Sequence, residues 1–530
     1  MGGGLLQLVA YGAQDAYLTG NPHITFWKIL YKRHTNFAME AFRVNFTGAP
    51  VYGQRLVATV NRNADLIWKT YVEVTLPNTD GTSAGTDVVW SPGHYRRLGY
   101  ALLQQVEVEI GGQIIDRHYG EWLYIWETLT ADVDTASKLE AMVDAETSGQ
   151  TTSGTSCNGR PTVLYVPLQF WFCRNPGLAL PLIALQYHEV RFNITLEDAV
   201  NLVSVNPGPG SPISAAAAQL PALTDMALYL DYIYLDVEER RRFAQESHEY
   251  LIEQLQYEGQ QQITTSSARL DLTLNHPVKE LIWVVQRDSF VDCNAPPTPW
   301  IMEALGQQPF NYSDDWSTEG IVTAVLGRGA LATNGTGGAV PTFSVSAGPG
   351  AGFLPGSATA GFAYAQSAIN GLGVATNSGL TTGSGIYQTD GSAGADNFFE
   401  GTTNYLLAKV ILASNVKCEG KNPVEVAKVQ LNGQDRFDER EGRYFDKVQP
   451  WQHHTRTPSV GINVYSFALK PEEHQPSGTC NFSRIDKATL NLTLSVNTVQ
   501  QQRTAKVRIY AVNYNVLRVM SGMGGLAYSN

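Results

Sequence analysis

Residues 55–68, RLVATVNRNADLIW, and residues 269–283, RLDLTLNHPVKELIW, are two versions of one stretch, and they decide how the whole chain folds. Four residue pairs share a displacement of 214 positions (269 minus 55): Arg55/Arg269, Leu56/Leu270, Thr59/Thr273 and Asn61/Asn275. After a one-residue insertion, the Leu-Ile-Trp triplets that end the two stretches match as well. Both stretches alternate apolar and polar residues before a bulky β-forming cluster, which is typical of a half-buried strand.

Three further matches occur in the same order along both halves of the chain. They pair residues 39–44 with 252–257, residues 110–113 with 431–434, and residues 192–196 with 490–494. Asp116 and Gly120 follow the second match and are echoed by Asp438 and Gly442, which we interpret as repeated turn residues rather than catalytic ones. Ordered matches of this kind indicate that one β-domain occurs twice in the chain.

The displacement between the two halves changes along the chain and so locates the insertions. It grows by 106 residues (321 minus 215) between Trp283 and Leu431, and it falls by 23 (321 minus 298) between Gly120 and Phe192. The first excess contains a Gly/Ala/Ser/Thr-rich tract at about residues 321–397, and the second contains ADVDTASKLEAMVDAETSGQTTSGTS. Neither has the apolar periodicity to line a core, so both are predicted to be surface loops.

The composition favours a large β-protein and argues against several other classes. The 530 residues leave room for two or three domains, 16% of them are charged and 10% are aromatic. A formal net charge of −12 argues against direct binding of nucleic acid, which relies on clustered Lys and Arg. The five cysteines are scattered and odd in number, which favours a reducing compartment. The N-terminus is a poor secretion signal and no apolar run is long enough to cross a bilayer, so a soluble protein is expected.

The predicted strands and turns divide the chain into five parts. They are an N-terminal arm (1–25), a first β-domain (26–235), a short linker helix (236–248), a second β-domain (249–516) with the Gly-rich insertion at about 317–397, and a C-terminal tail (517–530). The linker segment, DVEERRRFAQESH, has good helix formers, Glu before Arg and no β-branched cluster. A further helix is predicted at Ala136–Ala145, and the tail is predicted to be flexible or held only by another chain.

The sequence contains no motif for catalysis or cofactor binding. There is no P-loop, no GxGxxG opening a helix, no GxSxG elbow and no HExxH pair. His453-His454 could bind metal, but no ligand cluster lies at suitable spacing, so a loop or surface position is the preferred interpretation. Asp314-Asp315 beside Trp316 could be a carboxylate pair or a sugar platform, and an acidic turn before the insertion is preferred. We therefore expect no catalytic, cofactor-binding or metal-binding residues.

Asn-x-Ser/Thr sequons provide one candidate modification site. Asn193 and Asn491 lie in predicted strands and are poor acceptors of a glycan. Asn334 lies in the Gly-rich insertion and is predicted to be accessible. Asn334 is therefore the candidate glycosylation site.

Three long segments resemble the major capsid proteins of nucleocytoplasmic large DNA viruses. They are GAQDAYLTGNPHITFWKILYKRHTNFAMEAF (residues 12–42), DYIYLDVEERRRFAQESHEYLIEQ (residues 231–254) and YSFALKPEEHQPSGTCNFSRID (residues 465–486). The segments lie at the start of the first β-domain, at the linker and late in the second β-domain. The resemblance therefore spans nearly the whole chain, except for the insertions at about residues 131–160 and 317–397.

This resemblance implies a mainly β double jelly roll, with two tandem eight-stranded antiparallel β-sandwich barrels, a short linker helix and long loop insertions. It also implies a homotrimer whose pseudo-hexagonal capsomers tile an icosahedral virion shell, assembled in the host cytoplasm around an internal membrane and the genome. Expected partners are neighbouring capsomers and minor capsid and penton proteins, without a transmembrane segment or direct nucleic acid binding. The insertion around Ile321–Asn397 is expected to face outward, and the arm Met1–Pro22 to face inward.

Two alternatives from other classes remain open on the sequence. A glycan-binding jelly-roll attachment protein would need an aromatic platform or bound calcium. A β-sandwich hydrolase would need two convergent carboxylates, which only the folded structure can place. A structural protein without enzymatic activity is the preferred interpretation.

Overall fold

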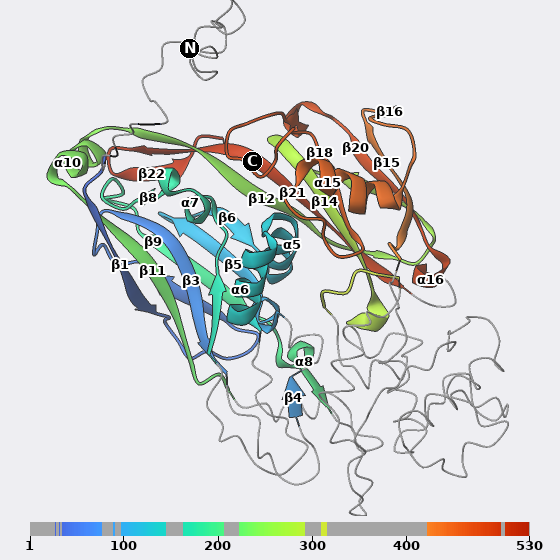
Figure 1. Cartoon of the computed structure of the whole chain (residues 1–530), viewed down its shortest axis with the longest axis horizontal. Coiled ribbons are helices and arrows are strands. Elements are labelled where there is room, and N and C mark those ends of the chain that lie inside the picture. The colour runs from blue at the N-terminus through green and yellow to red at the C-terminus, as the bar shows by residue number, and fades with distance from the viewer. Residues whose placement is uncertain are drawn as a thin grey trace, which may run out of the picture.

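The computed structural model describes most of the chain outside the long loops. The described residues are Trp27, Tyr31, 34–76, 88–90, 97–144, 163–205, 222–291, 309–314, 421–499 and 504–528. They form two units of antiparallel sheet that lie side by side, the first built from residues before about 236 and the second from those after it (Figure 1). The predicted insertion at about 317–397 lies outside the described residues.

The first unit is a sandwich of two sheets. One sheet has the strand order β1 (Phe37–Asn45), β11 (Asp225–Leu235), β3 (Leu66–Thr75), β7 (Val163–Pro167), with β8 (Leu180–Pro181) beside β3. The other has the order β2 (Arg55–Thr59), β9 (Val190–Leu196), β5 (Leu103–Ile110), β6 (Gln113–His118). A small separate pair joins β4 (Val88–Trp90) to β10 (Val203–Val205). Apolar side chains from the facing sides of the two large sheets form one continuous core.

The second unit repeats this arrangement. One sheet has the order β12 (His248–Ile263), β21 (Ala505–Met520), β14 (Pro277–Arg287), β18 (Ile462–Ser466), with β19 (Cys480–Asn481) beside β14 and β22 (Met523–Leu526) beside β21. The other has the order β13 (Ser267–Leu272), β20 (Ala488–Leu494), β15 (Val424–Leu431), β16 (Gln434–Asp435), with β17 (Arg440–Glu441) beside β15. A second apolar core lies between them.

Both units have the same topology. When the eight main strands of each unit are numbered along the chain, the sheet orders are 1-8-3-6 and 2-7-4-5 in both units. This is the strand order of a jelly roll, in which two Greek keys fold into an eight-stranded sandwich. The predicted duplication and the predicted double jelly roll are therefore confirmed, and we call the two units the first roll and the second roll.

The clearest trace of the duplication is one tight hairpin. Ile110 pairs with Gln113 between β5 and β6, and Leu431 pairs with Gln434 between β15 and β16. The two central residues have positive φ in both hairpins, 58° and 85° in the first roll and 50° and 80° in the second. Positive φ at both positions defines a type I′ turn, which favours Gly or Asn and matches the twist of the flanking strands.

The two Leu-Ile-Trp triplets lie in equivalent strands but not at equivalent positions. Ile67 faces the core of the first roll, whereas Ile282 faces away from the core of the second. The reason is the position of a β-bulge in each strand. In β3 the bulge begins at Trp68, at the end of the triplet, whereas in β14 it lies at Lys279, before the triplet. A slip of one residue moves a strand side chain to the opposite face, so the matching letters belong to different faces.

Short helices occupy the connections between strands. They are α4 (Leu98–Ala101), α5 (Gly120–Thr130), α6 (Val133–Val143), α7 (Trp171–Arg174), η1 (Pro176–Leu178), α8 (Ala199–Leu202), α10 (Val237–Gln245), η2 (Asp288–Phe290), η4 (Tyr444–Val448), α15 (Gln449–His453), η5 (Phe482–Arg484) and α16 (Val496–Val499). The linker helix predicted between the rolls is α10, capped by the Asp236 side chain, and it buries none of its residues. The helix predicted at 136–145 is α6, which begins three residues earlier because Asp132 caps it.

The two rolls stand beside each other with the same polarity. α10 joins the end of β11 at Leu235 to the start of β12 at His248, so these strand ends lie at one end of the molecule. β3 ends at Thr75 and β14 ends at Arg287, both at the other end of their strands. Both β3 and β14 therefore end opposite α10 (Figure 1).

The C-terminal segment is not the free tail that the sequence predicts. β21 continues to Met520 and turns into β22, with Leu517 paired to Leu526. The hairpin packs against the first roll, where the Tyr187 N–H donates to the Gly522 carbonyl at 2.9 Å. Tail residues up to Tyr528 are thus held by their own chain, because a two-stranded extension of the sheet satisfies their backbone groups.

The backbone around Gly120, at the start of α5, leaves no room for a side chain. A Cβ at this position would lie 1.9 Å from the carbonyl oxygen of Tyr100 and 2.3 Å from that of Leu103. We expect Gly120→Ala to lower the free energy of unfolding by at least about 1–3 kcal/mol, because backbone atoms cannot move away cheaply. Gly525→Ala is the control, because its nearest atom would be 3.4 Å away. Equal melting temperatures for the two variants would contradict the expected crowding.

Candidate functional site: the interface between the two jelly rolls

The helix α5 connects the two rolls physically. Its apolar residues Trp122, Ile125, Trp126 and Leu129 follow the spacing i, i+3, i+4, i+7, which places them on one face of the helix. All four are buried, and they pack in one cluster with residues of the second roll. Leu123, on the other side of α5, packs into the core of the first roll. One helix therefore inserts between two hydrophobic surfaces.

The surface that α5 covers is the outer face of the sheet β12–β21–β14–β18. Its apolar residues are Leu255 and Tyr257 in β12, Tyr510 and Val512 in β21, Ile282 and Val284 in β14, and Ile462 and Val464 in β18. The ring centroids of Trp122 and Tyr510 are 5.6 Å apart, and those of Tyr257 and Tyr510 are 4.9 Å apart. Burying one such side chain stabilises the folded state by about 1.5–3 kcal/mol, so the cluster makes the two rolls one folding unit.

A buried ion pair orients α5 on this sheet. The Glu121 carboxylate lies 2.7 Å from Arg508 Nη1 and accepts a hydrogen bond from the Tyr510 hydroxyl. Arg508 also donates to Gln286 Oε1 at 2.8 Å. Burial alone would lower the pKa of Arg508, but the Glu121 carboxylate raises it above its ordinary value. The guanidinium therefore stays charged and paired inside the interface.

A second buried group of charges joins the rolls beside Trp126. Arg174 of the first roll lies 2.8 Å from Glu253 of the second, and its guanidinium lies 3.9 Å from the Trp126 ring centroid. The fully buried Lys279 lies 2.8 Å from the same carboxylate. Burial alone would raise the pKa of Glu253, but Lys279, His474 and Arg174 lower it to about 2. Breaking one partner would leave an uncompensated buried charge, so the group fixes the relative position of the rolls.

The edge of the first roll also bonds to the first strand of the second. The Leu255 N–H donates to Asp116 Oδ1 at 3.0 Å, and the Gln254 side chain donates to the Ile115 carbonyl. Asp116 lies in β6 and is buried, with its other oxygen 3.0 Å from His118 Nε2. The prediction that Asp116 is a turn residue is therefore wrong. The prediction is wrong for Gly120 as well, because Gly120 is the first residue of α5.

The predicted surface pair His453-His454 is divided between surface and interior. His453 is half-buried, with Nδ1 at 3.0 Å from the Leu469 carbonyl. The His454 side chain is fully buried, with Nε2 3.1 Å from Glu280 and Nδ1 2.9 Å from Glu472. Burial alone would lower the pKa of His454, but the two carboxylates raise it to about 9. Of the predicted loop or surface position, the loop is correct for His454, which follows α15, and the surface is wrong, because His454 is a buried cation of the second roll.

Asp314 acts as an anchor for the long insertion. Its N–H donates to the Lys421 carbonyl at 2.8 Å, and the Lys421 N–H donates to Asp314 Oδ1 at 2.7 Å. The chain therefore leaves and re-enters the second roll at one place, as a surface insertion must. Asp315, Trp316 and Asn334 lie outside the described residues. Asn193 and Asn491 lie in β9 and β20, as predicted.

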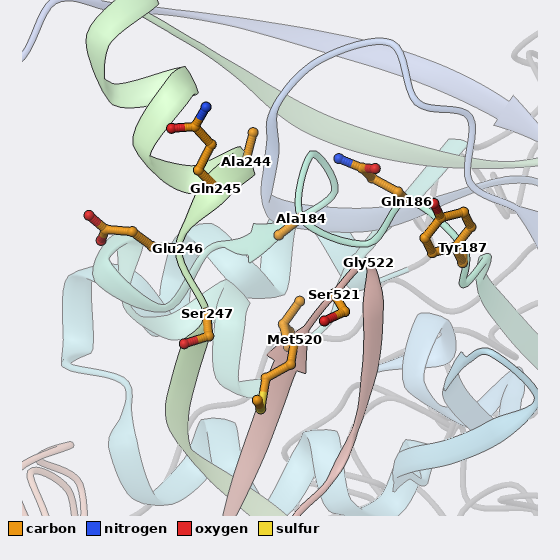
Figure 2. A pocket seen from close by; sticks show the side chains of 11 residues that line it. Ala184, Gln186, Tyr187, Ala244, Gln245, Glu246, Ser247, Met520, Ser521 and Gly522 are labelled. Carbon is orange, nitrogen blue, oxygen red and sulfur yellow. The ribbon is translucent and has the colours of Figure 1, made fainter.

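Other features of the described residues do not form a second site. A groove of about 530 Å³ lies between the end of α10 and the β21–β22 turn, and the side chains that line it do not converge on one point (Figure 2). Glu246, its charged lining residue, pairs with Arg242 at 3.1 Å. Within the described ranges, no group of three His, Cys, Asp or Glu side chains could hold a metal ion. None of the described helices is long and apolar enough to cross a membrane.

The helix α5 is not among the predicted elements, although its signal is present in the sequence. The spacing of Trp122, Ile125, Trp126 and Leu129 is that of an amphipathic helix. The buried partners Arg174, Glu253, Lys279 and Arg508 carry no comparable signal. They come from segments far apart in the chain, and only the folded structure brings them together.

Two jelly rolls of the same topology in one chain, joined by a shared helix, define a double jelly-roll protein. Comparison with known proteins then gives its family. Residues 25–236 match the family described as "Major capsid protein N-terminus", and residues 239–525 match the "Large eukaryotic DNA virus major capsid protein" family. The chain is 49% identical to the major capsid protein of Phaeocystis pouchetii virus and 38% identical to that of Paramecium bursaria Chlorella virus 1. Each alignment covers 100% of both chains.

Solved structures agree with this assignment. The "PBCV-1 virus capsid, quasi-atomic model" is similar with a TM-score of 0.61 and 33% identity, over 96% of this chain and 100% of that chain. The Faustovirus major capsid protein has a TM-score of 0.60 at 13% identity, over 96% and 94%, which is a likeness of fold alone. The chain belongs to the family of large eukaryotic DNA virus major capsid proteins, and the resemblance noted in its sequence is confirmed.

The buried His454 predicts a stability that depends on pH. Its pKa is raised from 6.5 to about 9, so its contribution is fully present below about pH 6.5 and is lost as the pH rises through 9. At about 1.4 kcal/mol for each pKa unit, that contribution is about 3 kcal/mol. We expect His454→Gln to lower the melting temperature strongly at pH 6.5 and much less at pH 9.5. His453→Gln is the control, and an equal loss for His454→Gln at both pH values would contradict a charged His454.

Proposed function

We propose that the protein is the structural subunit of an icosahedral virion shell, and that three copies form a pseudo-hexagonal capsomer. Membership of the major capsid protein family supports this proposal. The observation that carries it is the presence of two rolls of one topology, packed side by side with the same polarity. Three such chains around a threefold axis present six similar units, and a near-hexagonal outline packs in a continuous array.

The sandwich architecture suits a protein that must assemble only through chosen surfaces. Unpaired strand edges are templates for aggregation, and a jelly roll keeps its edges short or covered. Here β12 is covered by the β6 edge at Asp116 and Leu255, and β21 is extended by β22. Assembly would therefore use side-chain surfaces rather than open strand edges.

The proposed role is structural and not enzymatic. The relatives in the comparison are capsid proteins. The strongly shifted groups Glu253, His454 and Arg508 are all held by internal ion pairs, where their charges stabilise the fold instead of facing a substrate. The same composition that argues against nucleic acid binding, a net charge of −12, supports a shell that encloses the genome without gripping it.

The polarity of the rolls supports an orientation in the shell. Both β3 and β14 end opposite α10, and we assign that end, with the long insertion, to the virion exterior. The α10 end, where β1 also begins at Phe37, then faces the interior, the internal membrane and the minor capsid and penton proteins. Assembly of the shell is assigned to the host cytoplasm.

The oligomeric state is the first test of this proposal. We expect the purified chain to have a mass three times its 58.0 kDa chain mass in native mass spectrometry and in light scattering. The trimer should persist after dilution, because a shell subunit needs a stable capsomer before it can pack into an array. A stable monomer at micromolar concentration would overturn the capsomer proposal.

The orientation can be tested by labelling assembled particles. Val496 in α16 and Val237 in α10 are 54% and 72% exposed and lie at opposite ends of the molecule. We expect an impermeant maleimide to label Val496→Cys in intact particles and to label Val237→Cys only after disruption. The isolated capsomer, in which both cysteines are accessible, is the control. The reverse pattern on intact particles would contradict the assigned exterior.

A further inference from the structure

The two rolls have equivalent outer faces, and among the described residues only the face of the second roll is covered by a helix of the chain. The side chains that face the core are Ile67, Thr70 and Val72 in β3 and Val278, Leu281 and Trp283 in β14. In each strand a β-bulge separates the first two of these residues by three positions instead of two. Aligning the two bulges makes Thr70 the counterpart of Leu281. One residue further along each strand, Tyr71 pairs with Tyr229, and Ile282 pairs with Tyr510.

Tyr229 is thus the counterpart of Tyr510, but their surroundings differ. Tyr510 is 1% exposed beneath α5, as described above. Tyr229 stacks on Tyr71 with ring centroids 5.1 Å apart, and Tyr165 of β7 lies 6.0 Å beyond and is 37% exposed. Among the described helices, α10 packs on this outer face near its C-terminal end, where Phe243 contacts the small cluster around Leu66 and Ile233. The first roll therefore presents a row of three tyrosines where the second roll has a covered cluster.

The second roll carries the counterpart of α5, in which Phe445 is buried in the core of that roll and Trp451 is exposed. α5 starts at Gly120 and the segment η4–α15 follows Gly442, and a Cβ on either glycine would meet a carbonyl oxygen at less than 2 Å. At this displacement of 322 residues (442 minus 120), Leu129 corresponds to Trp451. Leu129 is fully buried, whereas Trp451 is 75% exposed. Leu469, beside His453, is 72% exposed next to the same helix.

The charge at the start of the helix differs in sign between the two rolls. Within the chain, the acidic Glu121 of the helix meets the basic Arg508 of the sheet. At the displacement of 322, Glu121 corresponds to Arg443, which is exposed. The tyrosine row carries charges of both signs, with Glu73 and Asp231 near Tyr71 and with Arg43 opposite Tyr229 in β1, where it pairs with Asp225. The row therefore offers carboxylates to Arg443, the residue in the place of Glu121.

We propose that the tyrosine row Tyr71–Tyr165–Tyr229 of one copy is the docking surface for the η4–α15 segment of a second copy, with Trp451 over the tyrosines. This inference rests on the proposed trimer and names the surfaces that form it. The occupant is a second copy because the contact repeats the interface already present between the rolls. The tyrosine row belongs to the first roll and η4–α15 to the second, so the contact is head-to-tail. Such a contact closes into a ring when its rotation is one third of a turn, as in the proposed trimer.

The helix that is already occupied sets the order of rolls in that ring. α5 of each chain covers the second roll of its own chain, where Trp122, Trp126 and Leu129 are buried. It is therefore not available to the tyrosine row of another chain, which leaves that row to η4–α15. First and second rolls must therefore alternate around the ring, which six rolls from three chains do.

The first test is a charge placed at the centre of the contact. We expect wild-type protein to be a trimer and Trp451→Glu to be at least 90% monomeric at the same micromolar concentration in native mass spectrometry. Val496→Glu is the matched control, because Val496 is an exposed apolar residue of the same roll outside the proposed surface, and it should remain a trimer. Circular dichroism and the melting temperature of the Trp451→Glu monomer show whether the rolls are still folded.

The second test measures proximity and does not depend on weakening the trimer. Inside the chain Glu121 contacts Tyr510, so the counterparts Arg443 and Tyr229 of two copies should lie together. We expect the double variant Arg443→Cys/Tyr229→Cys to form covalent dimers and trimers with a short bis-maleimide crosslinker. The two single variants are the controls for the native cysteines and should give no ladder.

The outcomes separate this inference from the proposed function. A wild-type monomer would overturn the proposed capsomer and this interface together. A wild-type trimer that persists in Trp451→Glu and gives no crosslinked ladder would leave the capsomer intact and overturn the interface. Dissociation of Trp451→Glu into folded monomers, together with the ladder, supports both.

Discussion

The structure depends on the burial of one sheet face. The outer side of β12–β21–β14–β18 carries eight apolar residues that could not remain in water, and α5 of the other roll covers them. Because α5 also sends Leu123 into the core of the first roll, the two rolls cannot move independently. The two similar sandwiches of the duplication are in this way held in one fixed relative position.

Buried charges decide the geometry of that body more than its stability. The pairs Arg508–Glu121 and Arg174–Glu253 cross from roll to roll, and each must find its partner at hydrogen-bonding distance. Apolar contacts alone would allow one roll to shift against the other. A charge that loses its partner inside the interface remains desolvated without compensation, so these pairs oppose such a shift. The same two pairs therefore fix how the first roll sits on the second within one chain.

The duplicated halves have diverged most where they meet other surfaces. Their type I′ hairpins and sheet orders are the same, because strand pairing leaves few alternatives. Their outer faces differ, with Ile282 buried in one roll and Tyr71 partly open in the other. The helix after the fifth main strand differs in the same way, since Leu129 is buried and Trp451 is exposed. Divergence thus follows from what each surface packs against, inside the chain or outside it.

Local patterns in the sequence determined the repeat of one β-domain and the helices α6 and α10, because strand periodicity and helix caps act over a few positions. The jelly-roll form of the two domains was implied by the family resemblance. The same patterns could not show that the Leu-Ile-Trp triplets face opposite ways, that His454 is a buried cation, or that the C-terminal hairpin docks on the first roll. Those features depend on a bulge and on contacts between residues hundreds of positions apart. Only the tertiary structure decided them, because burial is a property of the neighbours that packing supplies and not of the residue itself.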